Sequence, residues 1–214
     1  MNKMNKLNVL KDDIFKYKNC NACTNHAECR FLSKYKISRS AIVAILSRKN
    51  NNIFLTLGLE NYGYYKDTYN MCAGGGSDYD INENGNYCWI NNLLRELKEE
   101  FKIKLSYIEY KKYFYVNNKS KIIIINNAPC FVGSVNIDLN KINKHVQRDL
   151  EDQTLSSCYK EMRDIRNINI FDIFNNNIKI STFAKQVIEK LRNLPIIDSL
   201  ANAKVVEVTK IDTQ

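Results

Sequence analysis

Apolar and polar positions alternate along the chain in a pattern that predicts mixed strands and helices. The runs SAIVAIL (40–46) and IFLTLGL (53–59) are rich in branched apolar residues, and RKNNN between them has the composition of a turn, so a hairpin is expected here. Further strands are expected at 104–116, 121–125, 129–137 and 166–173. Polar composition predicts loops at 60–69 and 70–86, and a long loop or short helix at 138–160.

Two segments have the period of an amphipathic helix. Between 88 and 101 the apolar residues recur at steps of three and four, namely Ile90, Leu93, Leu94, Leu97 and Phe101. A second helix is expected at 182–194, where Pro195 ends it, with one apolar face formed by Phe183, Val187, Ile188 and Leu191. Strands and helices in this order predict an α+β or α-β-α sandwich, in which helices flank a mixed β-sheet.

The length of 214 residues allows one sizeable domain with short extensions. Residues 1–36 are polar, basic and Cys-rich, and we expect an N-terminal extension there. The strand and helix pattern occupies 37–195, which predicts the main domain, and 196–214 would form a C-terminal tail.

The chain carries a formal net charge of +9. Such a surface attracts partners that carry phosphates, nucleic acid included, although an excess of lysine also serves solubility. The start MNKMNKLNVLKDD lacks the apolar core of a secretory signal, and no run approaches the roughly 18 apolar residues of a membrane span. Together with an odd number of cysteines, seven, this predicts a reduced, intracellular and cytoplasmic protein without a membrane partner.

Three carboxylates share one face of the expected helix at 88–101. A helix turns by about 100° per residue, so Glu96, Glu99 and Glu100 fall within a sector roughly 100° wide, beside the apolar stripe. Arg95 lies four residues before Glu99 and is expected to pair with it. Clustered carboxylates repel one another, and a hard cation such as Mg²⁺ or Mn²⁺, with substrate phosphates completing its shell, would remove that repulsion. The alternative is an ordinary solvated, charged helix face.

The segment RELKEE (95–100) resembles the REUXEE core of the Nudix box, in which U is an apolar residue. Gly74, Gly75 and Gly76 resemble the glycines that open that box, and the paired strands before it, the segment 161–173 and the helix near 183–191 follow the family's order. The resemblance covers about residues 38–194. It implies a Nudix domain at 37–195, with a mixed β-sheet flanked by helices.

The box departs from the family pattern GX5EX7REUXEEXGU at three points. The interval from the glycines to Arg95 is longer by about five residues, with the extra material in SDYDINENGNY. Tyr87 stands where the box has its first Glu, and Glu83 is the only Glu in the loop. Lys102 replaces the Gly that normally ends the helix in a left-handed conformation, so we expect a looser helix end.

The resemblance also implies a chemistry. Family members hydrolyse a pyrophosphate bond in a nucleoside diphosphate linked to another moiety, using Mg²⁺ or Mn²⁺. By position, Glu99 and Glu100 would be metal ligands, and Glu96 a further ligand or the general base. Arg95 would orient a box carboxylate, and a backbone carbonyl such as that of Gly75 would complete the metal shell. In some members the base comes from a later loop, where the candidates are Glu151, Asp152 and Glu161.

Several substrates fit this chemistry. Nucleotide sugars, dinucleoside polyphosphates, ADP-ribose and damaged nucleotides are small candidates, and the basic surface adds capped RNA. Tyr65, from a Tyr-rich segment, and Trp89 are candidates for stacking on a base, although both side chains also suit packing in the domain. Because the box is diverged, the alternative function is a nucleotide-binding module with impaired catalysis. The sequence specifies neither the substrate nor the oligomeric state.

Cys20, Cys23, His26 and Cys29 form a CxxCxxHxxC cluster in the N-terminal segment. Cys and His are ligands of zinc, and CxxC is the spacing of a zinc half-site. Common zinc sites combine half-sites from separated segments, so the alternative is a reduced, Cys-rich loop or helix. The cluster therefore predicts a candidate zinc site, and a further hypothesis is that residues 1–36 form a zinc-bearing arm that directs the domain to a partner.

Overall fold

The computed structural model describes residues 26–35, 37–73, 88–116, 118–135, 137–173, 178–194 and 197. The elements of the first half are α1 (Ala27–Leu32), β1 (Ile42–Lys49), β2 (Asn52–Glu60), β3 (Tyr69–Asn70), β4 (Cys72–Ala73), α2 (Trp89–Phe101) and α3 (Tyr107–Phe114). Those of the second half are β5 (Tyr115–Val116), β6 (Lys119–Ile125), β7 (Ala128–Ser134), α4 (Leu139–Glu151), the 3-10 helix η2 (Ser157–Lys160), β8 (Met162–Asn169) and α5 (Thr182–Arg192).

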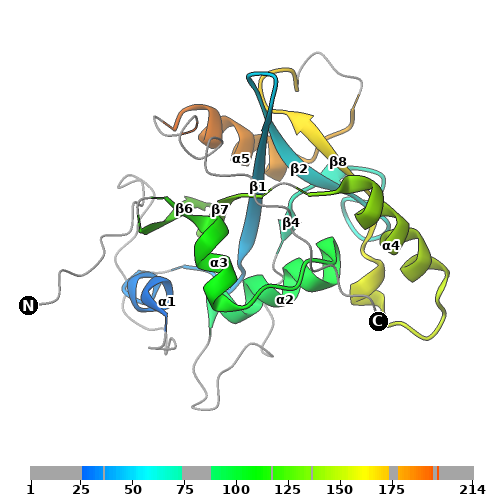
Figure 1. Cartoon of the computed structure of the whole chain (residues 1–214), viewed down its shortest axis with the longest axis horizontal. Coiled ribbons are helices and arrows are strands. Elements are labelled where there is room, and N and C mark those ends of the chain that lie inside the picture. The colour runs from blue at the N-terminus through cyan, green and yellow to red at the C-terminus, as the bar shows by residue number, and fades with distance from the viewer. Residues whose placement is uncertain are drawn as a thin grey trace, which may run out of the picture.

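A mixed β-sheet forms the centre of the fold (Figure 1). Its strands lie in the order β3-β2-β1-β7-β6-β5, while β8 pairs with β2 and β4 pairs with β1. β1 and β7 run parallel, and the other paired strands run antiparallel. β1 is central, and its residues Ile42 to Leu46 are all buried, which explains why SAIVAIL lacks polar alternation.

Helices cover both faces of the sheet, which confirms the predicted sandwich. Alternate residues of a strand point to opposite faces, so Val43 and Ile45 of β1 join one core while Ile42, Ala44 and Leu46 join the other. The first core also contains buried residues of α1, α2, α3 and α4, and the second contains those of α5. Within the described ranges, no helix is both long and apolar enough to span a membrane.

The expected strand at 104–116 is wrong, because most of this segment forms helix α3. Tyr and Phe favour strands, which explains the prediction. A capping box overrides that preference: the Ser106 hydroxyl accepts from the Glu109 N–H at 3.3 Å, and the Glu109 carboxylate accepts from the Ser106 N–H at 2.8 Å. Tyr110 and Phe114, four residues apart, then stack in the core with ring centroids 4.7 Å apart.

The segment 138–160 is more ordered than its polar composition suggested. It contains the thirteen-residue helix α4, which begins where the Asp138 carboxylate accepts from the Lys141 N–H at 3.0 Å. Ile142 and Val146 form the buried stripe of α4 and lie four residues apart. β8 begins at Met162 rather than at Arg166.

The short helix α1 packs into the first core. Cys29 and Leu32 are completely buried, as is the Glu28 side chain. The Glu28 carboxylate accepts hydrogen bonds from the hydroxyls of Tyr107 (3.1 Å) and Tyr115 (2.6 Å), so its charge is satisfied by donors from the neighbouring segment. The boundaries at 36 and 195 stay predictions.

The capping box at the start of α3 gives a stability prediction. Replacing Ser106 by Ala removes the hydroxyl that caps α3, and we expect the free energy of unfolding to fall by about 1 kcal/mol in urea denaturation. Ser156 precedes η2 and makes no cap hydrogen bond, so Ser156→Ala is the control and should change stability less. Equal effects of the two substitutions would contradict this explanation of α3.

Candidate active site

Helix α2 carries the predicted carboxylates. It begins after Cys88, whose sulfur accepts from the Asn91 N–H at 3.4 Å, and it buries its apolar stripe in the first core. Glu96 and Glu100 are nearly buried, with 5% and 3% of their surface exposed, whereas Glu99 is partly exposed. A merely solvated charged face would not bury two carboxylates, so the structure disfavours that alternative.

Arg95 fixes two of these carboxylates. Its Nη1 donates to Glu99 Oε2 at 2.6 Å, which confirms the predicted i,i+4 pair. Its Nη2 donates to Glu96 Oε1 at 2.5 Å and to Asn92 Oδ1 at 2.9 Å. The planar guanidinium therefore holds both carboxylates in fixed orientations relative to the helix.

Glu161 adds a fourth carboxylate from another part of the chain. It lies between η2 and β8, and its carboxyl interacts electrostatically with Arg95, Glu99 and Glu100 of α2. The backbone N–H of Asn61 donates to the Glu161 carbonyl at 2.8 Å, and the Tyr62 hydroxyl donates to the Ser157 carbonyl of η2 at 2.5 Å, so the loop after β2 is joined to the segment that carries Glu161.

The surroundings raise the pKa of two of these carboxyls. Burial raises the pKa of Glu96 to about 7, against the opposing effect of Arg95, and the charges of Glu99 and Glu161 act in the same direction as burial. Burial also raises the pKa of Glu161, and the charge of Glu99 adds to this. Arg95 pairs with Glu96 and Glu99, and its single positive charge does not balance the two. This all-oxygen donor set fits Mg²⁺ or Mn²⁺.

Lys102 ends α2 in the left-handed conformation, with φ of 58°. The looser helix end expected from the loss of the box Gly is therefore wrong. The Lys102 ammonium donates to the carbonyls of Glu99 (2.6 Å) and Tyr159 (2.8 Å) and pairs with Asp149 Oδ2 at 2.9 Å. These buried contacts offset the cost of a left-handed backbone at a residue other than glycine, about 1–2 kcal/mol. They also join the end of α2 to α4 and η2.

The other predicted site residues lie apart from the carboxylates or outside the described ranges. Trp89 is completely buried and donates from Nε1 to the Ser38 carbonyl at 2.8 Å, so its ring has no exposed face for stacking, which corrects that expectation. Tyr65 is partly exposed and packs edge-to-face on Tyr64. Glu151 is exposed at the end of α4. Gly75 lies outside the described residues.

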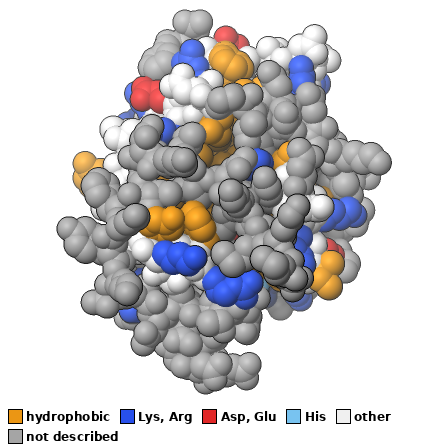
Figure 2. All heavy atoms as spheres, turned by 90° about the vertical axis from the view of Figure 1, so that its left-hand side faces the viewer, with side chains coloured by type: hydrophobic (Ala, Val, Ile, Leu, Met, Phe, Trp, Pro, Cys, Tyr) orange, Lys and Arg blue, Asp and Glu red, His pale blue; other side chains and the backbone are white. Residues whose placement is uncertain are grey.

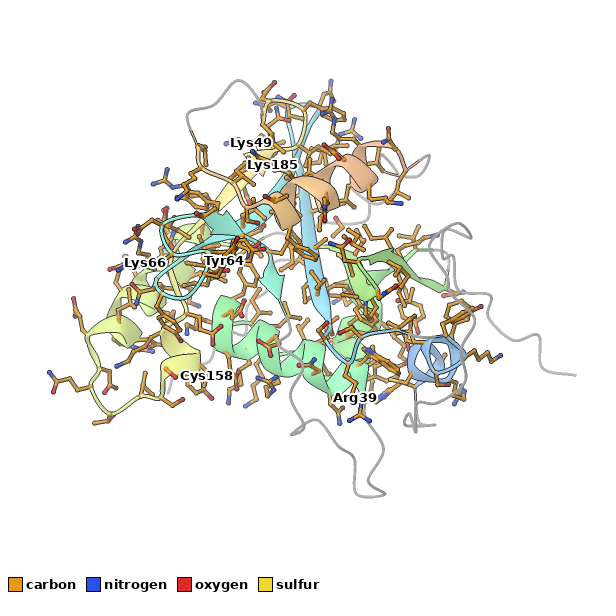
Figure 3. The ribbon with its side chains drawn as sticks, turned by 180° about the vertical axis from the view of Figure 1, so that it is seen from behind. Arg39, Lys49, Tyr64, Lys66, Cys158 and Lys185 are labelled. Atoms are coloured by element: carbon orange, nitrogen blue, oxygen red, sulfur yellow. The ribbon has the colours of Figure 1, made fainter. Side chains whose placement is uncertain are left out.

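The three candidates for a general base from a later loop therefore lie in different surroundings. Asp152 accepts from the Thr154 N–H at 2.8 Å and from its hydroxyl at 2.6 Å, and these bonds lower the pKa of Asp152. Glu161, in contrast, interacts electrostatically with Arg95, Glu99 and Glu100 of α2. Figure 3 shows Cys158 of η2 beside α2. Glu161 is the residue after the last residue of η2, so η2 brings it close to α2.

The N-terminal Cys/His cluster is described only in part. His26 and Cys29 lie together with Cys88, and their ligand atoms are within 4.8 Å of one another. Cys20 and Cys23 lie outside the described residues. Cys88 was absent from the predicted set, because a single cysteine 59 positions from Cys29 has no sequence pattern that connects the two.

A cavity of about 340 Å³ lies between α2, α4 and η2. It is lined by Lys98, Lys102, His145, Arg148, Asp149, Asp152, Leu155 and Tyr159. None of the four clustered glutamates is among these lining residues, so among the described residues the cavity is separate from the carboxylate site. Burial and the nearby cationic Arg148 lower the pKa of His145, which favours its neutral form.

Known proteins resemble this chain in structure rather than in sequence. No protein-family model matches the chain, and a search of the curated proteins finds no match. Similar solved structures include the Nudix domain of Shewanella oneidensis NrtR complexed with ADP ribose (11% identity, 72% of this chain and 84% of that chain, TM-score 0.41). Another is a C. elegans Ap4A hydrolase in a binary complex (15% identity, 72% and 95%, TM-score 0.41). Likenesses at this level establish neither a family nor an activity.

The raised pKa of Glu96 gives a pH prediction. A carboxyl whose pKa is raised from 4.5 to about 7 on folding binds its proton more tightly in the native state, so its stabilising effect is lost as pH rises through this window. Without divalent metal, we expect the free energy of unfolding to fall between pH 5 and 8, with Glu96 contributing up to about 3 kcal/mol. Urea denaturation at several pH values measures this change.

Two comparisons test whether Glu96 causes this pH dependence of the free energy of unfolding. Glu96→Gln should flatten the pH dependence, whereas Glu189→Gln, at an exposed position of α5, should keep it. Adding Mg²⁺ or Mn²⁺ should stabilise the wild type more at pH 8 than at pH 5, because the carboxylates bind metal only when ionised. A wild-type profile identical to that of Glu96→Gln would contradict the role of Glu96.

Proposed function

We propose that the chain is a Nudix-type pyrophosphohydrolase, which uses Mg²⁺ or Mn²⁺ to hydrolyse a nucleoside diphosphate linked to another moiety. The observation that carries the proposal is the carboxylate cluster of α2, in which Arg95 pairs with Glu96 and Glu99 while Glu96 and Glu100 are buried. The motif RELKEE supports the family, and the burial of its carboxylates supports a role beyond solvation. This support comes from the residues of the site itself and does not depend on the similar solved structures.

Each residue has a proposed role in this reaction. Glu99 and Glu100 hold the metal ion, with Glu96 as a further ligand, and Arg95 keeps Glu96 and Glu99 oriented. When bound, the metal neutralises the phosphate oxygens and lowers the pKa of a coordinated water. The carbonyl of Gly75 stays a proposed ligand.

Glu161 is the proposed general base. A water attacks one phosphorus, the bond from that phosphorus to the bridging oxygen breaks, and Glu161 accepts the proton of the water. Burial raises the pKa of Glu161 and so makes it a stronger base than an exposed carboxylate, and the Asn61 N–H holds its backbone carbonyl. Glu96 is the alternative base within the same cluster.

The proposed substrate is defined by the chemical group that would be cleaved. A small nucleotide derivative and capped RNA share the pyrophosphate that the site would cleave. Figure 2 shows Lys and Arg side chains on the described part of the face that carries α1, and the net charge of +9 favours polyanionic partners. A hydrolysis screen over nucleoside diphosphate derivatives and capped RNA identifies the substrate, and capped RNA would bind with the steeper salt dependence.

The metal-ligand assignment predicts the effect of one substitution. Glu100→Gln removes a charged ligand with little change in shape, so we expect metal-dependent turnover to fall at least about a hundredfold, because the metal supplies several kcal/mol. Glu189→Gln, on exposed α5, is the control and should retain wild-type turnover. Circular dichroism should show both variants folded. Near-normal turnover of Glu100→Gln would overturn the assignment, and nucleotide binding without hydrolysis in the wild type would favour the binding-module alternative.

The general-base assignment predicts a difference between two later glutamates. Glu161→Gln should lower kcat by about 10²- to 10⁴-fold and remove the acidic limb of the pH–rate profile, because the base is lost. Glu151→Gln makes the same chemical change at the exposed end of α4 and should leave kcat unchanged. Should Glu161→Gln keep its acidic limb while Glu96→Gln loses it, the base would instead be Glu96.

A further inference from the structure

Three zinc-type ligand atoms converge where α1 meets the start of α2. His26 Nδ1 lies 3.3 Å from Cys88 Sγ, and Cys29 Sγ lies 3.9 Å from the same sulfur. All three atoms are within 4.8 Å of one another. His26 and Cys29 come from the N-terminal segment, whereas Cys88 is the N-cap of α2, so the cluster combines two separated parts of the chain, as common zinc sites do.

The two spacings that include Cys88 agree with a tetrahedral metal centre. Zinc binds thiolate sulfur at about 2.3 Å and imidazole nitrogen at about 2.0 Å, so two sulfurs on one ion lie about 3.8 Å apart, and a sulfur and a nitrogen about 3.5 Å apart. The observed separations of 3.9 and 3.3 Å differ from these values by only a few tenths of an ångström. The ion therefore fits without rearrangement of the pairs that include Cys88.

The surroundings hold the ligands in place. Cys29 and Cys88 have 0% and 1% of their surface exposed. The His26 ring packs edge-to-face on Tyr107, with centroids 4.3 Å apart. The nearby Glu28 is hydrogen-bonded to tyrosine hydroxyls, so the converging donors are nitrogen and sulfur, a set that selects zinc over Mg²⁺.

A disulfide and ordinary buried thiols are the competing explanations. The Cys29–Cys88 sulfur separation of 3.9 Å far exceeds the disulfide bond length of about 2.0 Å, and the two residues are not bonded. Cys130 exemplifies an ordinary buried thiol: it lies in the second core, and burial alone raises its pKa. Cys29 and Cys88 differ from Cys130 because a ring nitrogen of His26 lies close to their sulfur atoms.

We propose that His26, Cys29 and Cys88 bind one zinc ion, which fastens the N-terminal segment to the start of α2. This revises the predicted ligand set by adding Cys88. The site does not rest on the proposed hydrolase function. It is distinct from the carboxylate site, because its donors are nitrogen and sulfur and it lies at the opposite end of α2 from Glu99 and Glu100.

Zinc at this position would stabilise the start of α2. The N-terminus of a helix favours negative charge, and Cys88 Sγ already accepts from the Asn91 N–H, so a metal-bound thiolate fits the cap. Figure 1 shows α1 beside α2, and the ion would join these two helices directly. Because the site forms only in the folded chain, binding of zinc would add to the free energy of unfolding.

The full-length protein, purified with a reductant, tests the site by its metal content. We expect one zinc per chain by elemental analysis, and after exchange with Co²⁺ the visible and near-ultraviolet bands of tetrahedral thiolate coordination. Cys88→Ser and Cys29→Ser should each weaken zinc affinity, in competition with a chelating dye, by more than about a hundredfold, since even losses around a site cost 10- to 100-fold. Cys158→Ser removes a partly exposed thiol of η2 and is the matched control, with unchanged affinity.

The same measurements can overturn the proposal. Wild-type protein that is folded and reduced but binds neither zinc nor Co²⁺ would refute the site without reference to any variant. A Cys29–Cys88 disulfide found by mass spectrometry in protein prepared under reducing conditions would also refute it. So would zinc affinity that survives Cys88→Ser unchanged, because the ion would then be held elsewhere. None of these readouts depends on hydrolysis, so failure of the zinc site and failure of the proposed function are distinguishable.

Discussion

The packing of four glutamate carboxylates near Arg95, with Glu96 and Glu100 buried and Glu99 and Glu161 partly exposed, is the constraint on which the candidate site depends. Burial removes the water that would screen their repulsion, and the pKa of Glu96 rises to about 7 as a result. A divalent cation bound by these carboxylates would relieve this repulsion and would couple metal binding to the proposed chemistry.

Helix α2 must be held firmly to keep this charge in place. At its C-terminal end, Lys102 bonds to Glu99 and Tyr159 and pairs with Asp149, which ties the helix to α4 and η2. The hydrogen bond from Lys102 to the Tyr159 carbonyl also holds η2, and Glu161 directly follows η2 in the chain. At its N-terminal end, Cys88 lies with Cys29 and His26 of the N-terminal segment. The proposed zinc ion would secure that end, so the carboxylates would lie between two fixed points of one helix.

Much of this architecture was predictable from local pattern. Helical period identified α2 and α5, and the i,i+4 spacing identified the Arg95–Glu99 pair, because both depend on residues close in sequence. Helix α3 was mistaken for a strand because its Tyr and Phe residues have strand propensity, although the capping box at Ser106 and Glu109 was visible. The contacts of Glu161 with Glu100 and of Cys88 with Cys29 join distant segments, and no spacing rule in a single sequence connects them. Gly75, Cys20 and Cys23 stay predictions.

The central claim is that the buried carboxylates form a binding site for a divalent cation. Crystals grown with Mn²⁺, measured at the manganese absorption edge, test it most directly, because anomalous scattering locates the ion independently of any activity. A manganese peak among the carboxylates of Glu96, Glu99 and Glu100 is the predicted result. Absence of manganese from these carboxylates at saturating Mn²⁺ and neutral pH would contradict it.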